Sequence, residues 1–242
     1  MDQFNQLSQE FQALTGTTLD DHALQAAHRY ADLLAEWNDR ISLTSITAPE
    51  DVRIKHFLDS LSCHLVMAGT PVSQVIDVGS GGGFPGLPLK LLYPEMHLTL
   101  VDSVAKKTSF LSLVVQELGL EDVEVLTDRV EMLGRSSAHR QRYDWAVARG
   151  VARLPVLAEY LLPLVRVGGF MLAQKGETAE REMDEAQTAI DTLGGSARPP
   201  VEVRLPGIPE LRYLLVIEKT APTPARFPRR VGIPAKRPIS DS

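Results

Sequence analysis

Cysteine is almost absent from this chain of 242 residues: Cys63 is the only one, so no disulfide can form within it. Long hydrophobic runs are missing too, because no window approaches the roughly 18 unbroken apolar residues that a membrane-spanning helix needs. The first ten residues, MDQFNQLSQE, contain neither the basic nor the apolar stretch of a signal peptide. The six histidines show no spacing that would place them with cysteine or carboxylate partners around a metal. These absences predict a cytoplasmic protein with no membrane contact and no bound metal.

The composition is otherwise ordinary, but the charge is unevenly distributed. Hydrophobic residues make up 44% of the chain and charged residues 23%, which is enough to bury a core. The net charge is −6; residues 221–242 carry five basic residues against one acidic residue, or +4, which leaves −10 for the rest. Because this segment also holds five prolines, we expect it to form no helix and to leave the sheet as an extended tail. Two interpretations remain open: the tail neutralises the phosphates of a polyanion, or it is a disordered end that aids solubility.

Residues 1–70 are predicted to form a small helical N-terminal domain. Apolar residues recur there at helical spacing, in two groups: Phe4, Leu7, Phe11 and Leu14, and then Tyr30, Leu33, Leu34 and Trp37. Thr18 followed by Asp21 resembles a capping box that opens the second helix. A third helix is expected over residues 51–67, with Val52, Phe57, Leu61 and Leu65 on or near one face.

Residues 71–220 alternate short apolar runs with longer amphipathic segments, and residues 221–242 form the tail. The runs are predicted strands over 75–78, 98–101, 123–126, 145–148, 170–173 and 213–217. The predicted helices lie between them, over 87–92, 105–118, 154–164 and 178–193. This order indicates an α/β fold, Rossmann-like, with a mostly parallel seven-stranded sheet that is closed by an antiparallel hairpin within 201–219. That layout is typical of class I S-adenosylmethionine-dependent methyltransferases.

The strongest local motif is the strand over 75–78, which runs into a glycine-rich turn. Glycine permits a positive φ and lets a ligand lie against bare backbone. Such a turn is shared by several nucleotide-binding folds, but here Asp77 precedes it and the spacing is G-x-G-x-G, beginning with Gly79 and Gly81. An acid suits the zwitterionic amino-acid end of S-adenosylmethionine, whereas it would repel a pyrophosphate. We therefore expect Asp77, Gly79 and Gly81 to contact this cofactor; the alternative is a tight turn with no ligand.

Asp102 follows the second strand and is the next candidate. A carboxylate at this place can accept hydrogen bonds from both ribose hydroxyls of a nucleoside cofactor, and Ser103 comes directly after it. The other interpretation is an N-cap for the helix that follows, and one residue can serve both purposes.

Two more segments end strands at the same edge of the predicted sheet, 127–131 and 143–150. Ligands of open parallel sheets bind beyond the carboxyl ends of the strands, where the strand order reverses. Val130 and Glu131 are therefore expected to flank the adenine, and Arg149 to point into the mouth of the site. For Arg129 and Arg149 the alternative is a surface salt bridge.

Taken together, the motifs resemble those of the bacterial 16S ribosomal RNA guanine-N7 methyltransferase family, also called glucose-inhibited division protein B. The resemblance covers nearly the whole chain. It is carried by Trp37-Asn38 with Ile41–Thr44, by Lys55–Leu61, Asp77–Pro88, Leu100–Ser103, Arg129–Glu131, Ala148–Ala152 and Lys175-Gly176, and in the tail by Phe227–Pro238. The chain departs from the usual family pattern at Ser42, Lys55 and Gly150.

The resemblance implies methyl transfer from S-adenosylmethionine to N7 of a guanine in the 530 loop of the small-subunit ribosomal RNA. It implies that the cofactor is contacted by Gly79, Phe84, Asp102, Val130, Glu131 and Arg149. It implies that Arg129, Arg149 and Lys175 orient the RNA. Guanine N7 carries an in-plane lone pair, so no general base is expected, and catalysis would come from positioning and a matching electrostatic field.

Two other functions remain open from the sequence. One is a class I methyltransferase of a small molecule or a protein, with the helical N-terminal domain as a lid. The other is a ribosome-binding factor that keeps the fold without catalysis. The intact glycine turn and Asp102 argue against the factor, and the basic tail argues mildly against a small-molecule substrate.

Overall fold

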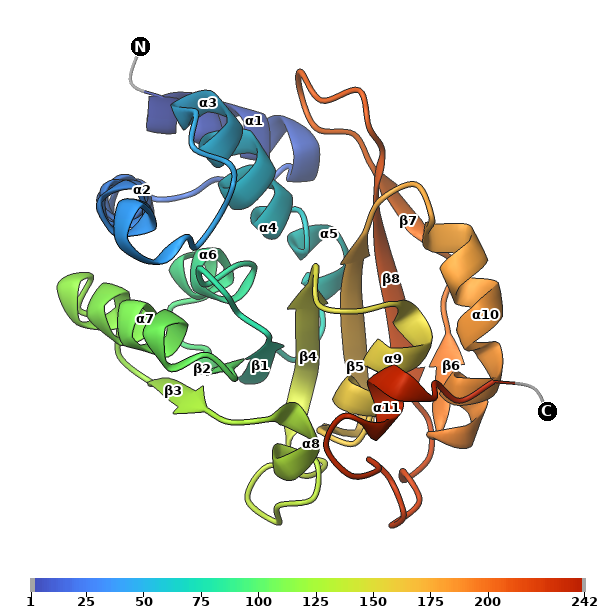
Figure 1. Cartoon of the computed structure of the whole chain (residues 1–242). Helices are drawn as coiled ribbons and strands as arrows, with labels where there is room; N and C mark the ends of the chain where they lie inside the picture. The colour runs from blue at the N-terminus through green and yellow to red at the C-terminus, as the bar shows by residue number, and fades with distance from the viewer. Residues whose placement is uncertain (1–2, 241–242) are drawn as a thin grey trace.

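The computed structural model describes residues 3–240, in which helices cover both faces of a single twisted sheet (Figure 1). The strands are β1 (Gln74–Val78), β2 (His97–Asp102), β3 (Val123–Thr127), β4 (Tyr143–Arg149), β5 (Val165–Lys175), β6 (Gly195–Ala197), β7 (Val201–Val203) and β8 (Arg212–Lys219). Their order is β3-β2-β1-β4-β5-β8-β6, with β7 also paired to β8. The strands from β1 to β5 pair in parallel, and β8 runs antiparallel to β5. The α/β fold and its antiparallel closure are confirmed.

The edge beyond β8 consists of two short strands rather than one. β6 and β7 pair with opposite ends of β8, on the side away from β5. Pro199 and Pro200 lie between them and lack the backbone N–H that a continuous strand would donate. The eight strands therefore occupy seven positions in the sheet, in line with the predicted seven-stranded layout.

Alternation of side chains along each strand divides the core into two layers. On one face Val75, Leu98 and Trp145 pack with the N-terminal helices; on the other Ile76 and Ala146 pack with the later helices. Five helices lie in the segments that connect successive strands from β1 to β6. They are α6 (Gly86–Leu92), α7 (Ala105–Glu117), α8 (Val130–Leu133), α9 (Leu154–Leu161) and α10 (Ala179–Thr192). No helix among residues 3–240 has the length and apolar character to cross a membrane.

The chain begins with two amphipathic helices, α1 (Gln3–Thr15) and α2 (Asp21–Ile41), as the spacing predicted. The expected cap is wrong, however: Asp20, and not Thr18, is the N-cap of α2, and its carboxylate accepts a hydrogen bond from the backbone N–H of Ala23 at 2.7 Å. The helices share their apolar layer with one face of the sheet. The division into domains at residue 70 stays a prediction.

The single third helix expected over 51–67 is wrong. The structure has α3 (Pro49–Val52), a π-helical turn η1 (Arg53–Leu58), α4 (Asp59–Leu61) and α5 (His64–Met67). Arg53 and His56 in the π turn, and Asp59 directly after it, lie inside the protein although they are polar. Leu65, which was expected near the apolar face, lies in α5 and is 37% exposed.

The tail is folded against the body, so the expected extended conformation is wrong in part. It contains the short helix α11 (Ile233–Lys236), with Pro234 in the first turn, where a missing N–H leaves no helical bond unmade. Figure 1 shows α11 beside α9, and residue contacts between the two helices agree with this. Phe227 is buried in the same apolar layer as α9 and α10.

We expect Asp20→Ala to lower the free energy of unfolding by about 1 kcal/mol, the usual effect of removing an N-cap acceptor. Thr18→Ala is the matched control, since the structure gives Thr18 no capping bond to α2. Denaturant unfolding measures both. A larger loss from Thr18→Ala than from Asp20→Ala would contradict this assignment of the cap.

Candidate functional site

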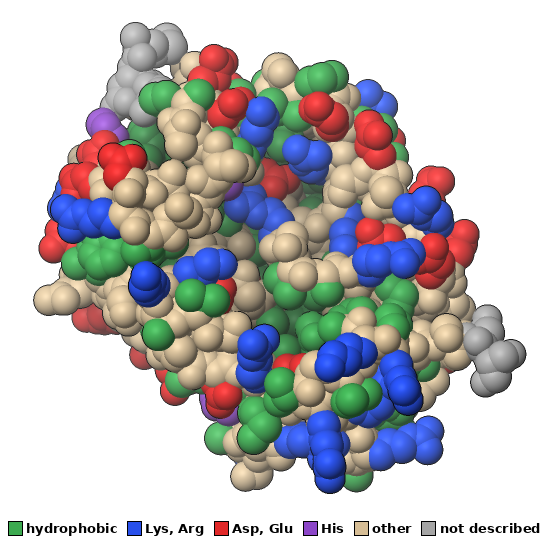
Figure 2. Space-filling view, in the orientation of Figure 1, with side chains coloured by type: hydrophobic (Ala, Val, Ile, Leu, Met, Phe, Trp, Pro, Cys, Tyr) green, Lys and Arg blue, Asp and Glu red, His purple; other side chains and the backbone are tan. Residues whose placement is uncertain are grey.

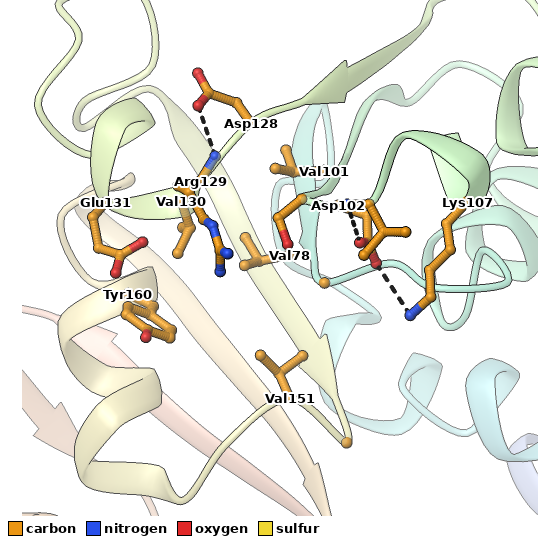
Figure 3. Close-up of a pocket in the computed structure, with 14 residues that line it drawn as sticks. Val78, Val101, Asp102, Lys107, Asp128, Arg129, Val130, Glu131, Val151 and Tyr160 are labelled. Atoms are coloured by element: carbon orange, nitrogen blue, oxygen red, sulfur yellow. Dashed lines mark hydrogen bonds and ion pairs between the residues drawn. The ribbon is translucent and has the colours of Figure 1, made fainter. Parts of the chain in front are cut away.

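A cavity of about 300 Å³ opens at the carboxyl ends of β1 to β4. In the strand order β1 lies between β2 and β4, so the direction of winding reverses here, where open sheets bind their ligands. Figure 3 shows the lining side chains, which come from the ends of these strands, from the loops that follow them and from helices α7, α8 and α9. The lining residues are Val78, Gly79, Val101, Asp102, Ser103, Val104, Lys107, Asp128, Arg129, Val130, Glu131, Gly150, Val151 and Tyr160.

The glycine turn shapes one wall of this cavity. Gly79 has a φ of 70°, and its backbone N–H donates to the carbonyl of Val101 at 2.7 Å. A Cβ at Gly79 would stand 2.5 Å from Cγ2 of Val151 across the turn. Glycine is therefore required here for its conformation and for the close approach of the two loops.

Asp102 lies at the rim of the turn with most of its surface buried. Its Oδ2 accepts from the backbone N–H of Gly81 at 3.1 Å, and its Oδ1 accepts from that of Val104 at 2.9 Å. The ammonium of Lys107 is 3.8 Å from Oδ2. The carboxylate thus joins the glycine turn to the start of α7, although Val104 and not Asp102 occupies the N-cap position. Each oxygen keeps capacity for a further donor, and the residue lines the cavity.

The opposite wall begins at Arg129, which precedes α8. Arg129 is exposed and forms no ion pair among the described residues, and Figure 3 shows its guanidinium extending among the lining side chains. Val130 and Glu131 are buried. Glu131 is held by the tail, because its Oε1 accepts from the backbone N–H of Gly232 at 2.8 Å. Burial, with Glu131 nearby, raises the pKa of Tyr160, which faces the same space.

Asp77 does not line the cavity. Val78 does, and side chains alternate along a strand, so the Asp77 carboxylate points to the other face of the sheet. It is fully buried, and its Oδ2 accepts from the backbone N–H of Gly86 at the start of α6, at 2.9 Å. Its Oδ1 has no donor among the described residues, and burial raises the pKa of Asp77 to about 7. The carboxylate therefore fixes the end of the glycine turn from behind.

Gly81 and Phe84 are also absent from the lining. The ring of Phe84 is stacked between Tyr30, at 5.2 Å, and His56, at 4.5 Å. The guanidinium carbon of Arg149 lies 5.2 Å from the centre of the same ring. Phe84 thus connects the turn to the N-terminal helices.

Arg149 ends β4 and points to the helical layer rather than into the first cavity. Its Nη1 donates to the carbonyl of Lys55 at 2.9 Å and to Oδ2 of Asp59 at 2.8 Å, and its Nη2 lies 3.1 Å from Nδ1 of His56. Burial, and then the positive charge of Arg149, lower the pKa of His56 to about 3. The neutral ring therefore accepts at Nδ1 and donates from Nε2 to the hydroxyl of Thr44, at 2.9 Å. We call Arg149, His56 and Asp59 the Arg149 clamp.

A second cavity, of about 410 Å³, adjoins the first, and Gly150 lines both. The lining of the second cavity is Ile46, Lys55, His56, Asp59, Arg149, Gly150, Gln174, Lys175, Gly176, Thr178, Glu182 and Arg212. Lys175 donates to the carbonyl of Ala152 at 2.6 Å and pairs with Glu182 at 2.8 Å. Two buried acceptors, Oδ1 of Asp59 and Oε1 of Gln174, have no donor among the described residues.

The sequence-predicted residues therefore separate into three groups, of which Asp77, Gly81 and Phe84 line neither cavity. Gly79, Asp102, Ser103, Val130 and Glu131 line the first cavity together with Arg129, while Arg149 and Lys175 line the second. Tyr160, Asp59 and His56 were missed as site residues. Lys55–Leu61 was noted as a stretch that matches the family. Its contact with Arg149 at the end of β4 could not be predicted, because Asp59 and Arg149 are 90 residues apart in the sequence.

Comparisons with known sequences agree with one another. The model of a family described as rRNA small subunit methyltransferase G matches residues 23–202. A protein of Roseiflexus castenholzii named ribosomal RNA small subunit methyltransferase G is 52% identical over 224 residues, which cover 93% of this chain and 95% of the relative. A protein of the same name from Alkaliphilus metalliredigens is 48% identical, covering 93% of this chain and 94% of its own.

Solved structures are similar in fold. A Corynebacterium glutamicum protein superposes with a TM-score of 0.52 at 20% identity, covering 85% of this chain and 93% of its own. TrmN from Thermus thermophilus gives a TM-score of 0.51 at 18% identity, over 67% of this chain and 48% of its own. At these identities the likeness concerns the fold alone.

We expect Asp77→Asn to flatten the pH dependence of stability between about pH 4 and pH 7. The pKa of Asp77 is about 7 in the folded protein against a usual 3.8, so the folded protein keeps a proton that the unfolded chain has released. Its stabilising contribution is complete below about pH 4 and is lost as the pH rises through 7. Denaturant unfolding of both proteins from pH 4 to pH 8 gives the difference. Parallel stability curves would show that Asp77 titrates normally.

Proposed function

Because this chain belongs to the rRNA small subunit methyltransferase G family, we propose that it transfers a methyl group from S-adenosylmethionine to N7 of a guanine in the 530 loop of 16S ribosomal RNA. The observation that carries the proposal is the pair of cavities that meet at Gly150, one suited to the cofactor and one to the target base. The enzyme would act in the cytoplasm, on the RNA of the small ribosomal subunit.

The first cavity fits S-adenosylmethionine by its shape and its polar groups. Gly79 lines this cavity with its backbone and carries no side chain, so a ligand can lie against that backbone. Asp102 would accept from the ribose hydroxyls, with Ser103 beside it, and Val130 and Glu131 would flank the adenine. When bound, the cofactor supplies a methyl group on a positively charged sulfur.

Asp77, Gly81 and Phe84 would act on the cofactor from behind the cavity wall. Asp77 holds the backbone of Gly86, Gly81 donates to Asp102, and Phe84 is stacked against His56. Each fixes a part of the turn whose front surface forms the wall. They are positioning residues in this proposal, while Gly79 and Asp102 touch the ligand.

The second cavity would receive the target guanine. N7 carries a lone pair in the plane of the ring, so the chain needs no group to remove a proton before methyl transfer. Guanine also offers N–H donors at N1 and N2, on the side of the base away from N7. The unpartnered oxygens of Asp59 and Gln174 are acceptors of the matching kind, and a buried acceptor without a donor costs free energy.

The three cations have different surroundings and would have different roles. Arg129 is exposed at the rim, free to stack on a base or to grip a phosphate. Lys175, held by Glu182 and Ala152, would fix the RNA at the second cavity. Arg149 is held by Lys55, Asp59 and His56, so it would orient the wall between the cavities. Substrate orientation would thus supply the catalysis that a general base does not.

The product of the reaction tests the proposed function. Small subunits that lack the modification are incubated with the enzyme and radiolabelled S-adenosylmethionine, and the labelled base is mapped. We expect label in N7-methylguanine of the 530 loop. Label that enters a small-molecule extract but no ribosomal RNA would favour a small-molecule methyltransferase, and cofactor binding without any transfer would favour a ribosome-binding factor.

Asp102 and Lys175 should separate binding from transfer. Asp102→Ala should weaken cofactor binding by about 1–3 kcal/mol, the range for a charge-assisted hydrogen bond, as measured by calorimetry. Lys175→Ala should lower the rate of methylation at least about tenfold, or 1.4 kcal/mol, with a smaller change in cofactor affinity.

Two controls belong to this pair. Thermal unfolding of Asp102→Ala checks the turn, because Asp102 also accepts from Gly81 and Val104. Glu182→Gln breaks the same ion pair as Lys175→Ala but keeps the ammonium. Equal losses of rate from Glu182→Gln and Lys175→Ala would show that the ion pair, and not contact of Lys175 with RNA, accounts for the effect.

A further inference from the structure

A patch of exposed cations covers the C-terminal segment. It consists of Arg226, Arg230, Lys236 and Arg237, and we call it the tail patch. Among residues 3–240, no carboxylate forms an ion pair with any of the four, whereas most exposed arginines elsewhere, such as Arg181, Arg198 and Arg204, have an acidic partner. Figure 2 shows Lys and Arg side chains gathered over the lower part of the molecule, where Figure 1 places α8 and α11.

The segment that carries the patch is firmly attached. Arg229 forms a bidentate ion pair with the buried Glu159 of α9, at 2.5 to 3.0 Å, and its backbone N–H donates to the same carboxylate at 2.7 Å. The guanidinium of Arg140 donates to the carbonyls of Thr223 at 2.7 Å and Phe227 at 2.8 Å. The backbone that carries the patch is therefore bound to the body of the protein at Thr223, Phe227 and Arg229. This favours a binding surface over the solubilising end that the composition left open.

The patch is directly connected to the first cavity. Gly232, between Arg230 and Lys236, donates its backbone N–H to Glu131, and Glu131 lines that cavity. Arg135, in the turn after α8, is exposed and donates to the carbonyl of Arg226 at 3.2 Å, which extends the cationic surface back toward Arg129. A polyanion lying on the patch would therefore run past the mouth of the site.

The charge balance of the chain indicates what the patch binds. Residues 221–242 carry +4 on a protein whose remaining residues sum to −10, so the body as a whole repels a nucleic acid. An enzyme that works on such a substrate needs a local surface of unpaired cations, since neutralising phosphates releases counterions and supplies most of the sequence-independent affinity. Arginine suits this surface because its planar guanidinium matches the geometry of a phosphate.

We propose that the tail patch binds the phosphate backbone of RNA next to the target base, so that the C-terminal segment forms one side of the RNA-binding surface. This inference rests on the proposed function, because it takes the substrate to be RNA. The segment places its cations through Glu131 and Glu159, two carboxylates of the body, and thereby fixes the RNA relative to the cofactor cavity.

The test compares two triple variants of the full chain. Arg230→Gln, Lys236→Gln and Arg237→Gln together remove three charges from the patch; Arg181→Gln, Arg198→Gln and Arg204→Gln remove three charges from α10 and from the loops after β6 and β7. Both change the net charge equally. Binding to unmodified small subunits is measured at several salt concentrations, methylation is measured at saturating cofactor, and calorimetry gives the affinity for S-adenosylmethionine.

We expect the patch variant to bind small subunits at least about tenfold more weakly than the control, with a salt dependence flatter by up to about 0.9 log units for each phosphate that the variant no longer neutralises. Its affinity for S-adenosylmethionine should equal that of the control. If the two variants bind small subunits with the same affinity and salt slope while the wild-type enzyme methylates them, the patch proposal fails and the proposed function stands. If the wild-type enzyme neither binds nor methylates small subunits, the patch proposal and the proposed function both fail.

Discussion

The alternation of side chains along β1, β4 and β5 is the constraint on which the site depends. Because neighbouring residues of a strand face opposite layers, the ends of these strands deliver functional groups to both sides of one edge. Val78 faces the first cavity while Asp77, one residue earlier, holds the glycine turn from the helical layer. At the end of β4 the chain turns from Arg149, in the clamp, to Gly150, which lies between the two cavities. A shift of one residue in register would exchange these roles.

Much of this arrangement could be predicted from the sequence, because it follows from local patterns. Alternating strands and helices gave the α/β fold and placed the site at the carboxyl edge, where the structure has its first cavity. Gly79 and Asp102 were identifiable because a glycine turn and a strand-ending carboxylate each have a short-range signature. The antiparallel pairing of β8 with β5 followed from the lack of a helix before the last strand. The residues taken to hold the cofactor and the RNA remain predictions.

The features that the sequence did not reveal all depend on contacts between distant segments. The expected helix over 51–67 missed the π turn, in which His56 contacts Arg149, and Asp59, which follows the turn and pairs with Arg149 about 90 residues later. Arg149 was expected to point into the cofactor site. Its three acceptors belong to residues 55–59, and nothing near Arg149 in the sequence indicates these contacts. The proline content suggested an extended tail. In the structure Glu131 and Glu159 accept hydrogen bonds from residues 229–232, and no local pattern in the sequence indicates these bonds. In each case a buried polar group found its partner across the fold, as such groups must.

The interruption between β6 and β7 bears on how the protein behaves among copies of itself. A sheet edge exposes unpaired N–H and C=O groups, and a long, flat edge invites the strands of neighbouring molecules to extend it. Here the outermost position beyond β8 is divided into two strands of three residues each, and the two prolines between them cannot donate a hydrogen bond. An incoming strand would find no continuous run of partners on that side. The broken edge therefore disfavours strand pairing between molecules on this side of the sheet. Such pairing is the route by which incompletely folded chains with exposed strand edges aggregate.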